Sequence, residues 1–271
     1  MASARAKPST RAIAPSSPPA GEIRGTQQAP DVFRAKRRHA LFHSIDVPSL
    51  NAKALLALAA LAGAMAVLLF VPAGTIRYWQ AWVYLAVFTG ASLLVTVDLM
   101  RRDPELLRRR LRGGPTAEQR PAQKLVMLGA SIGFIALLVV PALERRFGWS
   151  SVPLPAVVAG NLLVAIGFYL IFLVYRENSF TSATIEVASD QQVVTTGPYA
   201  VVRHPMYAGG SLYLLGTPLA LGSYWGFAPL AAMMPFLIWR LIDEERFLVR
   251  NLPGYAQYRH RVRYRLVPFI W

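Results

Sequence analysis

Long runs of apolar residues constrain this chain more than any other feature. A membrane helix needs about 20 apolar residues to cross a hydrocarbon core of roughly 30 Å, and four separate runs have about that length. A fifth run, Met206–Ile242, is too long for one helix and is interrupted by Gly222 and Ser223, so it predicts a tight hairpin of two equal helices. We therefore expect an all-α, polytopic membrane helical bundle of about six spans. The four single runs are Leu50–Val71, Trp79–Met100, Leu125–Leu143 and Val152–Tyr175.

Positive charge is distributed unevenly along the chain, whose net charge is +15. With six spans and a cytoplasmic amino terminus, every Lys and Arg residue except Arg77, Arg145 and Arg146 falls on the cytoplasmic side. A bias of this kind sets the orientation of a membrane protein in the bilayer. It predicts that both termini are cytoplasmic, and it accounts for the charge without a nucleic-acid partner.

Composition divides the chain into three regions. Residues 1–49 are rich in proline, serine and basic residues, which predicts a disordered, basic cytoplasmic arm. Residues 50–151 hold the amino-terminal membrane helices and a basic loop, 101–124, whose leucine spacing predicts a short amphipathic helix on the membrane surface. Residues 152–271 hold most of the reactive side chains and are the predicted catalytic core. The chain has no cysteine, which excludes disulfides and thiolate metal sites, and no metal centre is predicted.

The fourth apolar run carries small and polar residues that a membrane helix does not need for its hydrophobicity. Gly160 and Gly167 are spaced so that a neighbouring helix could pack closely against them. Asn161 is expected to form a hydrogen bond between two helices. This run is therefore predicted to have a close helical neighbour.

Reactive side chains gather at the cytoplasmic end of the predicted hairpin. Pro205 favours an extended His204 and suits the first turn of a helix, so His204 is expected at a helix entrance. The returning helix brings Arg240 and Glu244 to the same depth as His204 and Tyr207. Arg240 and Glu244 are four residues apart and could form a simple surface ion pair. Polar groups that converge over an apolar cleft nevertheless indicate a binding site.

Several spaced motifs occur in a fixed order in the second half of the chain. They are Asn178-Ser179-Phe180, Val193-Val194-Thr195-Thr196-Gly197-Pro198-Tyr199, Arg203-His204-Pro205-Met206-Tyr207, Arg240-x-x-x-Glu244-Glu245 with Tyr258, and Arg265-Leu266-Val267-Pro268. Together they resemble the isoprenylcysteine carboxyl methyltransferase family, a phospholipid methyltransferase-like group of integral membrane methyltransferases. The similarity covers roughly residues 152–271.

The resemblance implies S-adenosylmethionine as the cofactor, bound without a Rossmann domain in a pocket closed by the cytoplasmic loop and the carboxy-terminal segment. It also implies that Arg240 orients the acceptor, and His204 is the second predicted catalytic residue. No glycine-rich dinucleotide motif follows a strand in this sequence, which agrees with that implication. The residues carried over as cofactor ligands are Gln191, Gln192, Val193, Val194, Tyr199, His204, Pro205, Met206, Tyr207 and Glu244.

The residues leave the acceptor open. A lipid or lipid-linked acceptor with a carboxylate needs no general base, and Arg240 could hold it with two hydrogen bonds. A phospholipid amine or a thiol would need a proton removed, for which His204 and Glu245 are the candidates. Two other classes are also open. An NADPH-dependent reductase of the sterol-reductase type would require basic residues beyond Arg176 and Arg203 to bind the phosphate groups. A carrier or structural membrane protein is the other class, and a carrier would require ionisable residues deep within its spans, which the sequence lacks.

Overall fold

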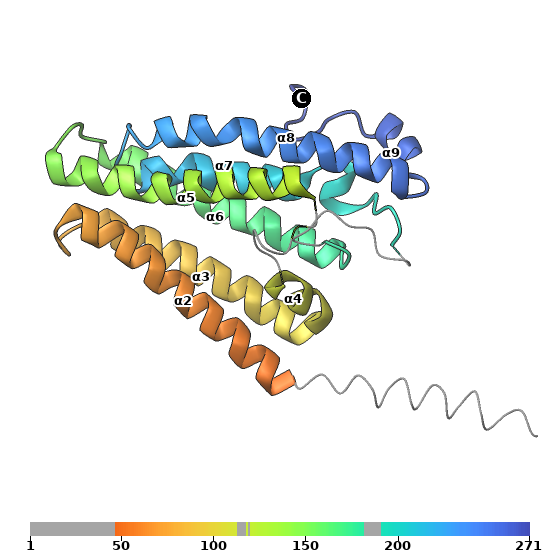
Figure 1. Ribbon diagram of the computed structural model, residues 1–271, viewed down its shortest axis with the longest axis horizontal. Helices are drawn as coiled ribbons and strands as arrows, with labels where there is room; N and C mark the ends of the chain where they lie inside the picture. The colour runs from red at the N-terminus through yellow and green to blue at the C-terminus, as the bar shows by residue number, and fades with distance from the viewer. Residues whose placement is uncertain (1–46, 113–117, 119, 182–190) are drawn as a thin grey trace, which may run out of the picture. The chain divides into compact units, whose positions relative to one another are not determined.

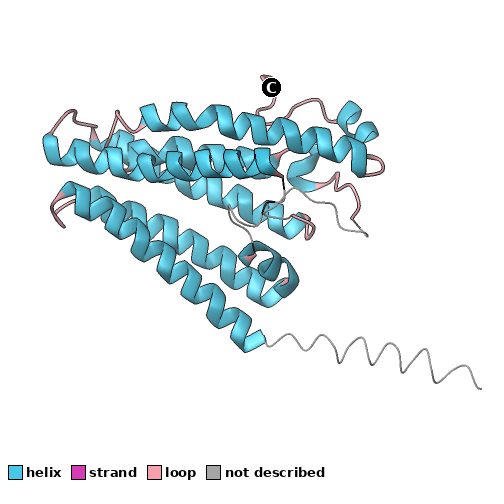
Figure 2. Ribbon diagram, viewed as in Figure 1, coloured by secondary structure: helices cyan, strands magenta, loops and turns pink. Residues whose placement is uncertain are grey.

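The structure, a computed structural model, describes residues 47–112, 118, 120–181 and 191–271 (Figure 1). The predicted basic arm falls almost entirely outside these ranges, as does the middle of the loop 176–203. Within them every regular element is helical, which confirms the all-α prediction (Figure 2). The helices in order are α2 (Val47–Ala73), α3 (Trp79–Arg102), α4 (Pro104–Leu111), α5 (Pro121–Phe147), α6 (Leu154–Glu177), the 3-10 turn η1 (Gly197–Ala200), α7 (Pro205–Ala220), α8 (Phe227–Asn251) and α9 (Tyr255–Arg261).

Among the residues that the structure describes, four helices are long and apolar enough to cross a membrane: Ser49–Ala73, Trp79–Arg102, Pro121–Phe147 and Leu154–Glu177. They coincide with the four single runs predicted from the sequence, and the chain is a polytopic helical membrane protein. The predicted hairpin also forms, because α7 and α8 are separate helices. Its two arms are not equal, since α7 has 16 residues and α8 has 25, so that prediction was wrong. The total of six spans stays a prediction.

The turn between α7 and α8 is held by buried polar groups. Gly222 adopts a φ of +70°, which allows the chain to reverse directly after α7. The Tyr78 hydroxyl donates to the Leu221 carbonyl over 2.6 Å. The buried Glu144 carboxylate accepts hydrogen bonds from the Ser223 hydroxyl and from the Trp225 N–H. These contacts fix the hairpin against α3 and α5.

The helices form pairs within the bundle. In Figure 1, α7 runs along α6, α8 runs along α5, and α2 lies beside α3. One cluster of buried apolar side chains joins α2, α3, α5, α6 and α7, and includes Leu69, Phe88, Leu138 and Val164. The outer faces of these helices expose many large apolar side chains, as a surface that faces lipid requires.

Glycines bring α6 and α7 into direct backbone contact. A Cβ atom placed on Gly160 would lie 2.3 Å from the Ala220 nitrogen, and one placed on Gly167 would lie 2.6 Å from the Gly209 carbonyl oxygen. The predicted close packing of this run is therefore confirmed. The prediction for Asn161 was wrong, because its side-chain amide donates to the Val157 carbonyl of its own helix over 2.9 Å.

The basic loop after α3 contains the predicted short helix, α4. Asp103 caps it by accepting a hydrogen bond from the Leu106 N–H over 2.9 Å, and Pro104 occupies its first position. Leu106 and Leu107 are buried, whereas Arg108, Arg109 and Arg110 are only partly buried. α4 is therefore amphipathic, and its position at the membrane surface stays a prediction.

Candidate cofactor and acceptor site

The entrance of α7 is paired with the carboxy-terminal segment. His204 is the residue before the first turn and has a φ of −125°, as expected for a residue that precedes proline. The backbone N–H groups of Arg203 and His204 donate to the carbonyls of Tyr264 and Arg265, each over 2.9 Å. The Arg203 guanidinium donates to two further carbonyls in this segment, one of which is that of Val262 over 2.9 Å. Residues 262–265 are therefore fixed beside the start of α7.

Glu245 joins these groups through a buried carboxylate. It lies 3.0 Å from Arg203 Nη2, 2.7 Å from Arg265 Nε and 3.7 Å from His204 Nε2. Burial would raise the pKa of the Glu245 carboxyl, but the hydrogen bonds from His204 and Arg265 and the charge of Arg203 outweigh it and lower this pKa to about 2. Glu245 is thus ionised at neutral pH and binds the carboxy-terminal segment to α7 and α8.

A second set of contacts fixes Tyr207 and Arg240 at the same level. The Tyr207 hydroxyl donates to Glu244 Oε2 over 2.6 Å, so α7 and α8 do meet at the depth predicted for them. Arg240 Nη1 lies 2.8 Å from Glu118 Oε1 and donates to Gln123 Oε1 over 3.0 Å. The described ion pair of Arg240 is therefore with Glu118, a buried residue before α5, rather than with Glu244.

The loop that precedes α7 is held by aromatic residues. The Asn178 side-chain amide donates to the Tyr199 hydroxyl over 2.9 Å, and the Tyr258 hydroxyl donates to the Tyr199 carbonyl over 2.7 Å. Val193 and Tyr199 pack against a buried cluster that contains Tyr255 and Tyr258. α9 therefore supports the part of this loop that the structure describes.

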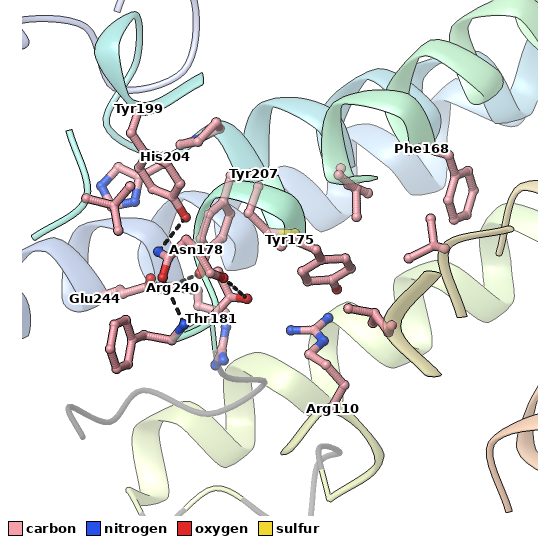
Figure 3. A pocket seen from close by; sticks show the side chains of 18 of the residues that line it. Arg110, Phe168, Tyr175, Asn178, Thr181, Tyr199, His204, Tyr207, Arg240 and Glu244 are labelled. Carbon is pink, nitrogen blue, oxygen red and sulfur yellow. Dashed lines mark hydrogen bonds between the residues drawn. The ribbon is translucent and has the colours of Figure 1, made fainter. Parts of the chain in front are cut away.

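These elements enclose a cavity of about 750 Å³, a size typical of small-molecule sites (Figure 3). Its polar part lies between the loop, α7, α8 and α9. Its apolar part extends among α2, α3, α4, α5 and α6. The cavity is lined by all the predicted cofactor ligands and by Arg240, but not by the alternative base Glu245. The lining residues from that prediction are Gln191, Gln192, Val193, Val194, Tyr199, His204, Pro205, Met206, Tyr207, Arg240 and Glu244. The structure brings them together, and their individual roles remain proposals.

The polar part of the cavity has the donors and acceptors that S-adenosylmethionine requires. The Tyr255 hydroxyl is buried, lines the cavity and has no hydrogen-bond partner among the described residues. His204 also lines the cavity. Glu244 offers a carboxylate beside them, and Leu248 and Val193 offer apolar surface. An amino acid carboxylate, an ammonium group and an adenine ring would each find a complementary group there, so the residues fit this cofactor.

Sequence reasoning missed several side chains that line or support the cavity. Tyr255 lies three residues before Tyr258, a residue of the family motifs, and this spacing was a usable signal. Arg110 belongs to the basic loop that was predicted to rest on the membrane surface, but it lines the cavity. Glu118 and Gln123 reach Arg240 from the other half of the chain, and nothing in their local sequence indicated this contact.

The fold and the cavity define a polytopic helical membrane protein with a partly polar, partly apolar binding site. Residues 155–253 match the phospholipid methyltransferase family. Among curated proteins, a 75-residue segment is 37% identical to the protein-S-isoprenylcysteine O-methyltransferase of Schizosaccharomyces pombe. This match covers 27% of the present chain and 32% of the yeast protein, so the chain spans about a third of that relative's length. The predicted resemblance is therefore confirmed, and the family match covers nearly all of α6, the loop after it, and the whole of α7 and α8.

Proposed function

We propose that this protein is an S-adenosylmethionine-dependent methyltransferase that acts on an apolar or lipid-linked acceptor at a carboxylate. The observation that carries the proposal is one continuous cavity with two chemically distinct parts. The polar part is formed by α9 and by residues of the segment that matches a methyltransferase family, and the apolar part is formed largely by helices that can cross a membrane. A water-soluble cofactor and an apolar acceptor could therefore meet inside the same site.

The polar part would hold the cofactor. His204 and Tyr255 present donor groups, and Glu244 presents the acceptor for an ammonium group while Tyr207 fixes its orientation. S-adenosylmethionine would supply a methyl group on a sulfonium centre, and the acceptor oxygen would displace the neutral thioether. Positioning and exclusion of water provide most of the rate in such a displacement, and the fixed contacts around Arg203 and Glu245 serve that purpose.

The apolar part would hold the acceptor. Two of the α2 residues that line it, Ala57 and Leu61, are exposed, so this part is open toward the lipid-facing side of the bundle. A carboxylate is already anionic at neutral pH and needs no general base. Arg240 would orient it, and the ion pair with Glu118 fixes the position of the guanidinium. With the predicted orientation, the polar part faces the cytoplasm.

Two alternatives are less well supported by these contacts. An amine or thiol acceptor would use His204 or Glu245 as a base, but His204 Nε2 lies 3.7 Å from Glu245, and Glu245 is itself bound by Arg203 and Arg265. A reductase would need Arg203 for the extra phosphate of NADPH. The Arg203 guanidinium is instead bound to Glu245 and to two backbone carbonyls.

Cofactor binding tests the proposal directly. Calorimetric titration of the purified protein in neutral detergent with S-adenosylhomocysteine should show saturable binding, and the thermal shift with this compound should exceed that with NADPH. Glu244→Ala and His204→Ala should each weaken binding, whereas Glu105→Gln on the exposed face of α4 should not. Binding that is unaffected in both site variants would contradict the assignment. Mass spectrometry after incubation with isotopically labelled S-adenosylmethionine would identify the methylated acceptor.

A further inference from the structure

Residues 265–271 form a closed loop after α9. The backbone N–H groups of residues 265–267 all donate to the Trp271 carbonyl oxygen, over 2.8 to 3.2 Å. The Arg265 guanidinium carbon lies 5.4 Å from the centre of the Trp271 ring, which closes the base of the loop a second time. The residues between these contacts form its apex, and we call residues 267–270 the carboxy-terminal tip.

The carboxy-terminal tip exposes apolar side chains more fully than any membrane helix does. Phe269 is 88% exposed and Ile270 is 80% exposed, and no other large apolar side chain among the described residues reaches these values. Phe269 also has a φ of +67°, and no other residue apart from glycine has a positive φ in the part of the chain that the structure describes. A bulky residue adopts this conformation only where surrounding contacts impose it. The contacts that close the loop therefore hold these two side chains outward.

The loop is attached to α8 near the expected membrane surface. Arg265 Nε lies 2.7 Å from Glu245 Oε2, and in Figure 1 the carboxy terminus lies beside α8 rather than beyond its end. Trp239, which is 45% exposed, precedes Glu245 on α8 by a rise of about 9 Å. Exposed tryptophans of membrane proteins gather at the boundary between the hydrocarbon and the headgroups. The carboxy-terminal tip is therefore within reach of the headgroups.

Positive charge accompanies the apolar side chains. Arg259, Arg261 and Arg263 directly precede the loop and are exposed, and we call them the tip arginines. None of them pairs with a carboxylate among the described residues. Exposed apolar side chains next to unpaired cations are typical of surfaces that bind anionic lipid, because the apolar groups enter the interface while the cations contact the phosphates.

We propose that the carboxy-terminal tip is a lipid-binding element, in which Phe269 and Ile270 insert among the headgroups of an anionic bilayer surface while the tip arginines bind its phosphates. Insertion would brace residues 262–265, which are paired with the start of α7, against the membrane. This inference goes beyond the proposed function and does not depend on it, because no residue of the tip lines the cavity.

The absence of cysteine allows a probe to be placed at one position at a time. Ile270→Cys would be labelled with bimane in the purified, full-length protein and reconstituted into phosphatidylcholine nanodiscs, with or without phosphatidylglycerol. Two quenchers report on opposite surroundings, since a nitroxide-labelled phosphatidylcholine acts inside the bilayer and iodide acts from the water. Ile238→Cys on the exposed face of α8 is the lipid-facing control, and Gln257→Cys on the exposed face of α9 is the aqueous control.

In nanodiscs that contain phosphatidylglycerol, the nitroxide lipid should quench the probe at position 270 at least about half as strongly as the probe at position 238. Iodide should quench it about threefold less than the probe at position 257. Strong quenching by iodide with none by the lipid would overturn the proposal. Protection from both quenchers would overturn it as well, because protein would then cover the tip.

A substitution beside the probe shows whether the protein or the attached label drives insertion. Phe269→Ser in the labelled protein should reduce quenching by the nitroxide lipid by about half or more, because it removes the larger of the two exposed apolar side chains. Unchanged quenching would mean that the label alone enters the bilayer, and would refute the role of Phe269.

The charge of the bilayer tests the tip arginines. Replacement of about a third of the phosphatidylcholine by phosphatidylglycerol should increase lipid quenching at position 270 about twofold. Joint replacement of the tip arginines by glutamine should abolish this increase. The matched control replaces Arg77, Arg145 and Arg146 by glutamine, which removes three exposed charges from the α2–α3 loop and the end of α5, and it should keep the increase. An equal loss in the control, or no increase in the unaltered protein, would refute the binding of anionic lipid.

Discussion

Replacement of Gly160 by alanine tests whether the contact between α6 and α7 determines the stability of the bundle. The added Cβ atom would lie 2.3 Å from the Ala220 nitrogen and 2.7 Å from the Gly216 carbonyl oxygen, whereas ordinary contacts begin at 3.4 Å. The two helices must therefore separate locally by about 1 Å, which forfeits a quarter to a half of the dispersion energy of the contacts involved.

The expected magnitude is a difference between two opposing effects. Overpacking of this kind costs about 1–3 kcal/mol. Replacement of glycine by alanine within a helix raises the free energy of unfolding by up to about 1 kcal/mol, because alanine has the higher helix propensity. Gly160→Ala should therefore lower the free energy of unfolding by about 1–2 kcal/mol. Gly90→Ala in α3 is the matched control, because no atom lies within 4 Å of its added Cβ, and it should leave stability unchanged or raise it slightly.

Denaturation by sodium dodecyl sulfate in mixed micelles, followed by far-ultraviolet circular dichroism, measures both variants on one scale. Gly160→Ala should lower the detergent concentration at the midpoint of unfolding. Gly90→Ala should leave this midpoint unchanged or raise it slightly. Shifts of the same sign and size would refute the reasoning, because the α6–α7 contact would then have no special weight. A midpoint for Gly160→Ala above that of the unaltered protein would refute it as well.

Three further outcomes follow from the contacts in the site. Glu245→Gln should lower the free energy of unfolding by about 3–5 kcal/mol, because Arg203 and Arg265 would lose the buried carboxylate that pairs with them. Thermal unfolding in detergent measures this loss. The folded-state pKa of Glu245 is depressed from 4.5 to about 2, so its contribution to stability is complete above pH 4.5 and should be lost as the pH falls toward 2 in an acid unfolding series. Tyr207→Phe removes the hydrogen bond to Glu244 and should weaken S-adenosylhomocysteine binding about tenfold in calorimetry.

Matched variants separate these effects from nonspecific losses. Glu105→Gln removes an exposed carboxylate and should change stability by less than about 1 kcal/mol. Tyr169→Phe alters an exposed tyrosine of α6 and should leave cofactor binding unchanged. If Glu245→Gln were no more destabilising than Glu105→Gln, the buried network would not support the fold. If Tyr207→Phe bound S-adenosylhomocysteine as tightly as the unaltered protein, the hydrogen bond from Tyr207 would not be needed to hold Glu244 in place for binding.

The membrane helices were predictable because the bilayer constrains each of them separately. A helix in lipid must form its backbone hydrogen bonds within itself and must be about 30 Å long, so the length and hydropathy of a segment locate it. This explains why the four single runs agree with α2, α3, α5 and α6. The turn at Gly222 was equally local, since a glycine with positive φ breaks an otherwise continuous apolar stretch.

The parts that could not be predicted depend on contacts between distant segments. The Arg240–Glu118 pair spans 122 positions, and the sequence alone offered Glu244 as a nearer partner. The cavity-lining position of Arg110 depends on how α4 packs against α2 and α3, which no periodicity in α4 reveals. The family motifs predicted the residues of the polar part correctly because the residues of such motifs lie close together in the folded family members, even where they are distant in the sequence. No comparable motif described the apolar part.

The short length of α7 also affects how the protein fits its bilayer. A helix of 16 residues is about 24 Å long, less than the roughly 30 Å of a typical hydrocarbon core. With His204 at one membrane edge, the turn after Leu221 would be submerged, and its hydrogen bonds to Tyr78 and Glu144 would replace those that water cannot provide at that depth. Such hydrophobic mismatch favours thin bilayers. The protein should therefore be more stable in bilayers of short-chain lipids than in bilayers of long-chain lipids.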